Sequence, residues 1–325
     1  MFELPAAPFD RVALRNRLQL IRRTQALDYA ADGCRFSAPR TLAELHALRA
    51  QHPDATLVAG NTDVGLWINK QLRVIGHLIY TGEVVELKNI DRSQQAMRIG
   101  AAVPLENAYA ALSAHYPQLV EMWERFASPP IRNAGTMGGN VANGSPIGDS
   151  MPALIALGAR VVLSSTRGAR TLPLESLYVG YQKKAMAADE VVEAIEVPLP
   201  STALSFRTYK VSKRYDSDIS AVCAAFALHM NGDTIEDCRI AYGGMAAMPR
   251  RADRAESLLR GKRWDQSSAT EAAAALVEDL QPLSDLRASA GYRLRVAQNL
   301  LQRFHLETRP DAPLSVAQVS VFANA

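Results

Sequence analysis

Two glycine-rich loops dominate this sequence: LVAGNTDVG at residues 57–65 and TMGGNVANGSPIGD at residues 136–149. Glycine lets the backbone approach a ligand closely, and successive N–H groups in such turns form a concavity that binds anions. The Asn and Thr side chains add neutral hydrogen-bond donors. A Gly-Asn pair after a strand is typical of a plain turn, but two long loops of this composition favour a diphosphate site between them.

Neither loop carries one of the common nucleotide-binding fingerprints. The sequence has no G-x-G-x-x-G and no G-x-x-x-x-G-K-[ST], which excludes the ordinary Rossmann and P-loop interpretations. The hydrolytic patterns H-E-x-x-H and G-x-S-x-G are also absent, and the six histidines are scattered. Because no acid–base constellation is visible, we expect a bound cofactor to carry the chemistry.

The composition is that of a globular protein of two or three domains. The chain has 325 residues, 48% of them hydrophobic, and its net charge of +3 is too small for a strongly basic nucleic-acid-binding face. Cys34, Cys223 and Cys238 form no C-x-x-C pair, which argues against a disulfide framework or a metal site and predicts a cytoplasmic protein. Cys223 lies in an apolar run and is expected in the core. No apolar run reaches the length of a membrane span, and the N-terminus lacks a secretory signal.

Apolar periodicity predicts an N-terminal α/β part and a C-terminal α+β part, divided near residues 198–205. Before the boundary we expect strands over 55–59, 75–80, 84–87, 97–101, 160–165 and 190–197, and helices over 10–23, 41–51, 105–115 and 118–127. Beyond it we expect strands over 206–211, 219–230 and 234–242, then helices over 251–259, 267–280 and 287–304. Thr41 and Glu44 predict a capping box, and Leu294, Ala297, Leu301 and Phe304 share one helical face.

Two charged segments each have two interpretations. The basic helix over residues 10–23 is either a surface lead-in helix or a docking segment for a partner. The loop YKVSKRYDSDIS, residues 209–220, is either a solvated hairpin tip or a charged lid over a ligand.

Five separated blocks resemble the flavin-binding region of xanthine dehydrogenase, a molybdenum hydroxylase. They are VAGNTDVG (58–65), FASPPIRNAGTMGGNVANGSPIGD (126–149), Gly180-Tyr181, YKVSKRYDSDISAV (209–222) and IAYGGMAAMPRRA (240–252). Their order and spacing match from about Phe36 to about Leu306. The resemblance is greatest to the small subunit of bacterial xanthine dehydrogenases, and flavoprotein subunits of carbon monoxide dehydrogenase-type enzymes share fewer of these strings.

The resemblance implies an α+β fold. Its first domain would be a vanillyl-alcohol-oxidase (PCMH)-type FAD-binding domain of two α/β subdomains. A smaller α+β domain, like the C-terminal domain of carbon monoxide dehydrogenase flavoproteins, would follow. We expect a linker or docking arm at residues 1–35, the FAD-binding domain at 36–200, the C-terminal domain at 201–308 and a tail at 309–325.

The same resemblance implies which residues bind FAD. The diphosphate cradle would comprise Leu57, Val58, Ala59, Gly60, Asn61, Thr62, Asp63, Val64, Thr136, Met137, Gly138, Gly139 and Asn140. Phe126, Asp149, Val192, Lys210 and Ile219 would also contact FAD, with Lys210 approaching the flavin ring and Ile219 lying against it. Asp63 and Tyr181 would lie on the nicotinamide side. Alternatively, Phe126 and Ile219 are plain core residues, and Asp149 is the N-cap of a helix over 150–157.

The resemblance also implies partners. Full-length relatives begin with a ferredoxin-type domain whose cysteines hold [2Fe–2S] clusters, and no such cysteine spacing exists here. The clusters and the molybdenum cofactor, and with it purine oxidation, would therefore reside on partner chains or domains of a hetero-oligomer, without nucleic acid or membrane. The expected oxidoreductase passes electrons from those clusters through FAD to NAD+. A flavin subunit that uses oxygen, quinone or another acceptor, and a flavin-free assembly scaffold, are the alternatives.

Overall fold

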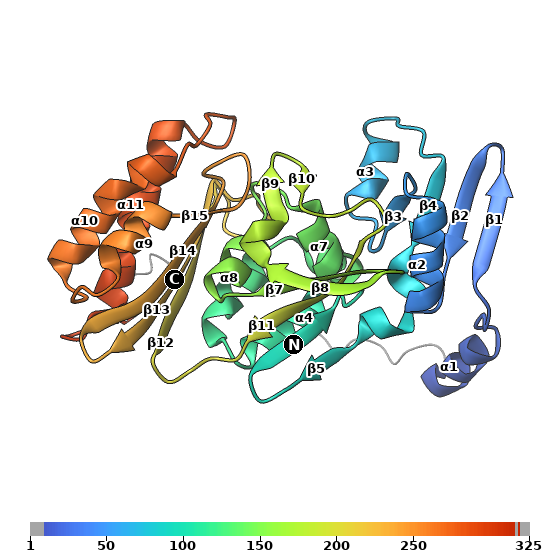
Figure 1. The fold of residues 1–325 in the computed structure, drawn as a ribbon, viewed down its shortest axis with the longest axis horizontal. Coiled ribbons are helices and arrows are strands. Elements are labelled where there is room, and N and C mark those ends of the chain that lie inside the picture. The colour runs from blue at the N-terminus through green and yellow to red at the C-terminus, as the bar shows by residue number, and fades with distance from the viewer. Residues whose placement is uncertain (1–9, 316–317, 319–325) are drawn as a thin grey trace.

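The computed structural model describes residues 10–315 and 318, and three parts follow one another along the long axis of the molecule (Figure 1). The helix α1 (Arg11–Leu20) lies at one end, and none of its side chains is buried. The predicted arm and tail extend into residues 1–9, 316–317 and 319–325, which lie outside the described residues.

The first part is a four-stranded sheet in the order β1-β2-β4-β3. Its strands are β1 (Leu27–Ala31), β2 (Cys34–Ala38), β3 (Thr56–Val58) and β4 (His77–Tyr80). Strands β2, β4 and β3 run parallel, while β1 pairs antiparallel with β2. The helix α2 (Leu42–Gln51) begins at Thr41, and the predicted capping box with Glu44 is confirmed. Strand β3 leads into the first glycine loop, which is followed by α3 (Val64–Asn69).

The second part is an antiparallel sheet in the order β5-β6-β11-β7-β8. Its strands are β5 (Ile90–Arg92), β6 (Ala96–Gly100), β7 (Arg160–Ser165), β8 (Gly168–Pro173) and β11 (Val191–Pro198). Its helices are α4 (Leu105–Ser113), α5 (Val120–Arg125), α6 (Pro129–Ala134), α7 (Met137–Asn143) and α8 (Ser150–Ala156). A small hairpin, β9 (Tyr178–Gly180) with β10 (Lys183–Lys184), precedes β11. One apolar core joins this sheet and its helices to the first part.

The third part is an antiparallel sheet in the order β12-β13-β14-β15 with three helices on one face (Figure 1). Its elements are β12 (Leu204–Val211), β13 (Val222–Asn231), β14 (Thr234–Gly243), β15 (Arg250–Arg251), α9 (Asp253–Leu259), α10 (Gln266–Asp279) and α11 (Ala290–Thr308). The core between sheet and helices contains Phe226, Tyr242 and Phe304. Cys223 is buried in β13, as expected. The strand–helix order predicted for the C-terminal part is confirmed.

Three local predictions differ from the structure. Residues 84–87 form a 3-10 turn, Val85–Lys88, because this segment bridges the first two parts with single backbone hydrogen bonds and not with a strand partner. The helix expected over 118–127 is a 3-10 turn followed by α5, which ends before Ala127 adopts a left-handed φ of 50°. Strand β1 and part of β2 occupy residues assigned to the arm. Asp32-Gly33, a typical two-residue hairpin turn, was the available signal.

Among the helices of the described residues, none combines the length and the apolar character that crossing a membrane requires.

Candidate functional site

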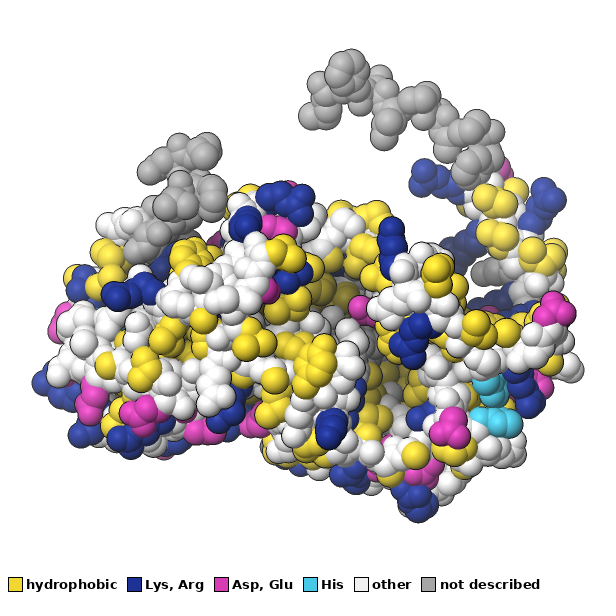
Figure 2. Space-filling view, turned by 90° about the horizontal axis from the view of Figure 1, so that it is seen from above, with side chains coloured by type: hydrophobic (Ala, Val, Ile, Leu, Met, Phe, Trp, Pro, Cys, Tyr) yellow, Lys and Arg dark blue, Asp and Glu magenta, His cyan; other side chains and the backbone are white. Residues whose placement is uncertain are grey.

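The two glycine loops face one cavity of about 640 Å³, here called the glycine-loop cavity. Residues 57–64 of the first loop line it, and so do Lys184, Val191 and Val192. From the second loop the lining residues are Gly135, Thr136, Gly138, Gly139, Asn140, Ala142 and Asn143. Figure 2 shows this face of the molecule hollowed between its first and second parts, with charged side chains along the rim. The sequence placed both loops at one site, and the structure brings them together.

Two glycines let the loops meet. An ideal Cβ on Gly60 would lie 1.9 Å from the carbonyl oxygen of Ala134, at the end of α6. An ideal Cβ on Gly138 would lie 2.3 Å from the Cβ of Ala101, after β6. Side chains at these positions would push the walls apart, so both glycines serve the packing of the loops against their neighbours.

Gly139 has a different role, because its hydrogen faces the cavity. It lies in the first turn of α7 and donates its N–H to the Thr136 hydroxyl at 3.1 Å. Its φ lies outside the left-handed region, so the backbone freedom expected of this glycine is not what the position requires. An ideal Cβ here would lie 2.9 Å from Thr136 Oγ1 and 3.9 Å from the Cβ of Ala59 across the cavity. Gly139 therefore keeps the space between the loops open.

Polar atoms in the walls are left without protein partners. The buried side-chain oxygen of Asn140 accepts no hydrogen bond from the residues that the structure describes. Asp63 precedes α3 but makes no capping hydrogen bond, and partial burial raises the pKa of its carboxyl. Because buried polar atoms are normally paired, these acceptors fit a ligand that donates hydrogen bonds, such as the ribose and ribityl hydroxyls of FAD.

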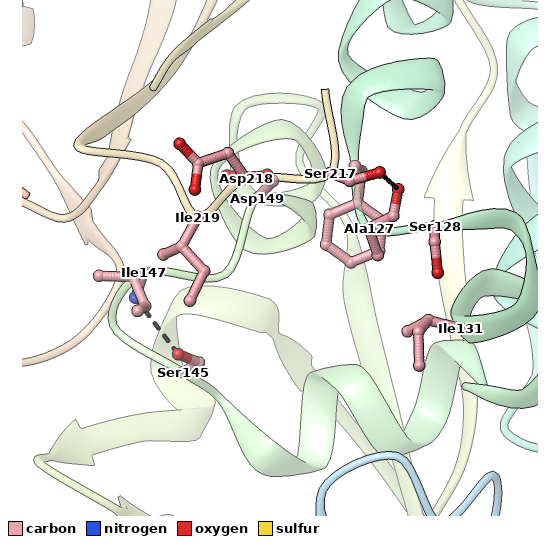
Figure 3. Close-up of a pocket in the computed structure, with 10 residues that line it drawn as sticks. Ala127, Ser128, Ile131, Ser145, Ile147, Asp149, Ser217, Asp218 and Ile219 are labelled. Atoms are coloured by element: carbon pink, nitrogen blue, oxygen red, sulfur yellow. Dashed lines mark hydrogen bonds between the residues drawn. The ribbon is translucent and has the colours of Figure 1, made fainter. Parts of the chain in front are cut away.

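A second cavity of about 460 Å³ lies beyond α6, and is here called the isoleucine cavity. Its apolar lining comes from Phe126, Ile131, Ile147 and Ile219, and its polar lining includes Asp149. Figure 3 shows Ile147 and Ile219 on one side, with Ile131 opposite. The side chain of Ile219 is 47% exposed, so it is not a plain core residue. An apolar slot of this kind suits a flat ring system.

A buried ion pair lies behind the isoleucine cavity. The Lys210 ammonium donates to the Asp149 carboxylate at 2.7 Å, to the Ser220 hydroxyl at 2.9 Å and to the Asp218 carbonyl at 2.7 Å. Ser220 donates to the second Asp149 oxygen at 2.6 Å. Asp149 holds the N-cap position of α8, as the alternative assignment has it, but its side chain makes no capping hydrogen bond and pairs with Lys210 instead. The network joins the end of the second glycine loop to β12 and β13.

The charged loop between β12 and β13 packs against the second part. The Arg125 guanidinium donates to the Tyr215 carbonyl and lies over its ring, 4.7 Å from the centroid. The Ser217 hydroxyl donates to the Ala127 carbonyl at 3.2 Å, as drawn in Figure 3. Because Ser217, Asp218 and Ile219 line the isoleucine cavity, the loop is a wall of that cavity and not a free hairpin tip.

Three predicted residues line neither cavity. Met137 is fully buried in the core, and Tyr181 is 61% exposed at the tip of the β9–β10 hairpin. Lys210 does not line the isoleucine cavity but hydrogen-bonds two residues that do, Asp149 and Asp218. Sequence reasoning missed the lining residues Trp67, Arg73, Ile131, Ile147 and Lys184. Of these, Ile131 and Ile147 stand inside the quoted second block, so their motif was the available signal.

The fold and the two cavities define a flavin-binding protein, and comparison with known proteins gives its family. Residues 31–200 match the family model of the FAD binding domain in molybdopterin dehydrogenase, and residues 207–308 match that of the CO dehydrogenase flavoprotein C-terminal domain. The chain belongs to this family of molybdenum hydroxylase flavoproteins, and the predicted α+β architecture is confirmed.

Its relatives include proteins of different size. Xanthine dehydrogenase/oxidase of Gallus gallus is 28% identical over 85% of this chain, which spans only 21% of that protein. The xanthine dehydrogenase FAD-binding subunit of Escherichia coli O157:H7 is 27% identical over 84% of this chain and 94% of its own. A structure of carbon monoxide dehydrogenase from Hydrogenophaga pseudoflava superposes with a TM-score of 0.78 at 28% identity, covering 85% of this chain and 96% of that chain.

Proposed function

We propose that this chain binds FAD without a covalent link and passes electrons from iron–sulfur clusters on a partner to NAD+. The observation that carries the proposal is the pair of glycine loops that line one cavity. FAD would supply the chemistry, since it exchanges single electrons with clusters and a hydride with nicotinamide. Among the described residues that line the two cavities there is no histidine or cysteine to serve as an attachment point.

The residues of the chain have separate tasks in this proposal. The two glycine loops hold the diphosphate, with Gly139 leaving room for it. The isoleucine cavity takes the flavin ring, with Phe126 and Ile219 excluding water from its faces. Asp149 presents a carboxylate edge to the ring, and Lys210 with Ser220 holds that carboxylate in position.

The proposed nicotinamide side consists of Asp63 and Tyr181. Asp63 lines the glycine-loop cavity, and its carboxylate makes no capping hydrogen bond to α3. Tyr181 lies in the β9–β10 hairpin directly before Gln182, which also lines this cavity. NAD+ is the favoured acceptor because these two exposed polar side chains flank an open mouth. A second candidate acceptor is oxygen, quinone or another oxidant, which the similarity to the carbon monoxide dehydrogenase structure favours.

The test is anaerobic reduction of the FAD-loaded chain, followed by flavin absorbance. Excess NADH is expected to bleach the flavin, as dithionite does, whereas xanthine is not, because the molybdenum cofactor is proposed to reside on a partner. Asp63→Ala and Tyr181→Ala are expected to slow reduction by NADH about 10-fold, which corresponds to one lost hydrogen bond, and to leave reduction by dithionite unchanged.

The matched control is Val179→Ala, on the same hairpin and 60% exposed. It is expected to behave as the wild type. If NADH leaves the loaded chain oxidised while dithionite reduces it, the second candidate replaces NAD+. A chain that binds no FAD at all would instead favour the scaffold alternative.

Asn61 offers a separate test of the first loop. Its φ of 61° is left-handed, and its amide packs beside Gly65. We expect Asn61→Gly, which keeps this backbone without strain, to weaken FAD binding by about 1–3 kcal/mol through the lost amide hydrogen bond. Asn61→Ala should lose the same affinity and also lower stability by about 1 kcal/mol, because Ala disfavours this φ. Fluorescence titration with FAD and urea unfolding measure the two effects, and wild-type affinity of Asn61→Gly would exclude the amide from the site.

The proposed partners are an iron–sulfur domain or subunit and a molybdenum-binding subunit in the cytoplasm. Helix α1 is the proposed docking element at the start of the chain. It exposes Leu14 and Leu18, and Ile21 directly after it is exposed as well. Arg23 pairs with Glu83 at 2.6 Å. This pair holds the helix near the body of the protein while its apolar residues stay open to a partner.

A further inference from the structure

The β9–β10 hairpin is fixed against the second glycine loop. The Tyr178 hydroxyl donates to the Val141 carbonyl in α7 at 2.9 Å, and its ring fills the space beside Gly144, where an ideal Cβ would lie 2.5 Å from it. Gly180 pairs with Lys183 across the hairpin, and the turn closes at Gln182, whose φ is 54°. The hairpin therefore presents its residues at a defined place relative to the loop.

Lys184, the last residue of this hairpin, lines the glycine-loop cavity. Its side chain is half-buried, and within residues 10–315 and 318 it makes no ion pair and no hydrogen bond. The nearby carboxylates are engaged elsewhere, since Glu190 pairs with Arg170 and Asp189 pairs with Arg167. Loss of water lowers the pKa of the Lys184 ammonium, with no carboxylate opposing that shift.

The other charges of the cavity leave this ammonium uncompensated. Among the described lining residues, the charged ones are Asp63, Arg73 and Lys184, so the walls carry one positive charge in excess. Arg73 is exposed and stacks over the Trp67 ring, 4.6 Å from its centroid. A partly buried cation without a partner is costly unless an anion completes the site. The loops themselves offer only neutral donors.

We propose that Lys184 is the cationic residue that binds the diphosphate of a dinucleotide in the glycine-loop cavity. This inference rests on the proposed function, and the diphosphate is that of FAD or of NAD(H). Lysine is a compact point charge on a flexible stem and pairs with phosphate without fixed geometry. The neutral loops shape the site, and Lys184 neutralises the ligand.

The experiment measures dissociation constants on the full chain in two arms. FAD is titrated into the chain stripped of flavin, and NADH is titrated anaerobically into chain saturated with FAD. Lys184→Ala is expected to raise one of these constants about 10- to 100-fold, the loss typical of a charge-assisted hydrogen bond. Lys184→Arg is expected to restore most of the affinity. The titration in which the dissociation constant rises identifies the dinucleotide, FAD or NADH, whose diphosphate Lys184 binds.

The dependence of affinity on ionic strength distinguishes a contribution of the Lys184 charge from a contribution of its packing. Affinity of the wild type is expected to fall as the salt concentration is raised about tenfold, from about 50 to about 500 mM, and Lys184→Ala is expected to flatten this dependence. Lys183→Ala is the matched control, since Lys183 is exposed and lines neither cavity. The inference is overturned if both arms stay at wild-type affinity, if Lys183→Ala weakens binding equally, or if the salt dependence of Lys184→Ala matches the wild type. A wild-type chain that binds no FAD would refute the proposed function itself, and this outcome differs from those that overturn only the role of Lys184.

Discussion

The Gly139→Val protein is expected to fold and to lose FAD. Gly139 faces the open cavity, and an ideal Cβ there lies 2.9 Å from Thr136 Oγ1, with Ala59 opposite at 3.9 Å. The two γ-carbons of valine would extend into the gap between the loops that the diphosphate needs. We expect the dissociation constant for FAD to rise about 100-fold or more, since overpacking a fitted site costs about 1–3 kcal/mol and one bonded contact is lost in addition. Flavin absorbance per protein and circular dichroism measure binding and folding.

Three further glycine variants calibrate this result. Gly139→Ala, which adds only the Cβ, is expected to bind FAD with intermediate affinity. Gly291→Val is the matched control, because nothing lies within 4 Å of an ideal Cβ at that position in α11. Gly138→Ala is expected to impair folding itself, because its Cβ would overlap Ala101. A folded Gly139→Val chain with normal flavin content would show that this loop does not contact FAD.

Breaking the buried ion pair is expected to give the largest loss of stability. Lys210 and Asp149 have side chains only 1% and 4% exposed, and Ser220 completes their network. Asp149→Ala or Lys210→Met leaves one buried charge without its partner. We expect either change to lower the free energy of unfolding by about 3–5 kcal/mol, measured by urea denaturation.

A double variant separates the contribution of the charges to stability from the contribution of side-chain packing at the same place. Asp149→Leu combined with Lys210→Met is expected to cost less than the sum of the single changes, because no charge is left buried. The matched control is Arg263→Ala, which removes an ion pair with Asp233 in which both side chains are half or more exposed, and which should cost about 0–1 kcal/mol. Single variants no less stable than Arg263→Ala would contradict the structural importance of this pair.

Local sequence signals predicted most of the elements. The expected strand over 160–165 is β7 with the same bounds, and the Thr41 capping box starts α2 as written. These features depend on neighbours a few positions away, so the pattern of side chains along the chain contains the information. The position of the two glycine loops was also predictable from the sequence, because a backbone that approaches another chain segment closely needs glycine at that point.

Only the tertiary structure determines the contacts between residues that are distant in the sequence. Lys210 meets Asp149 across 61 positions, and its role as a buried pairing partner was not visible in a loop that reads as charged and exposed. No sequence motif marks Lys184, and only the packing of the β9–β10 hairpin against α7 places it beside the cavity. The physical reason is that the environment of a charge, its loss of water and its partners, comes from the packing of elements and not from the residues beside it in the chain.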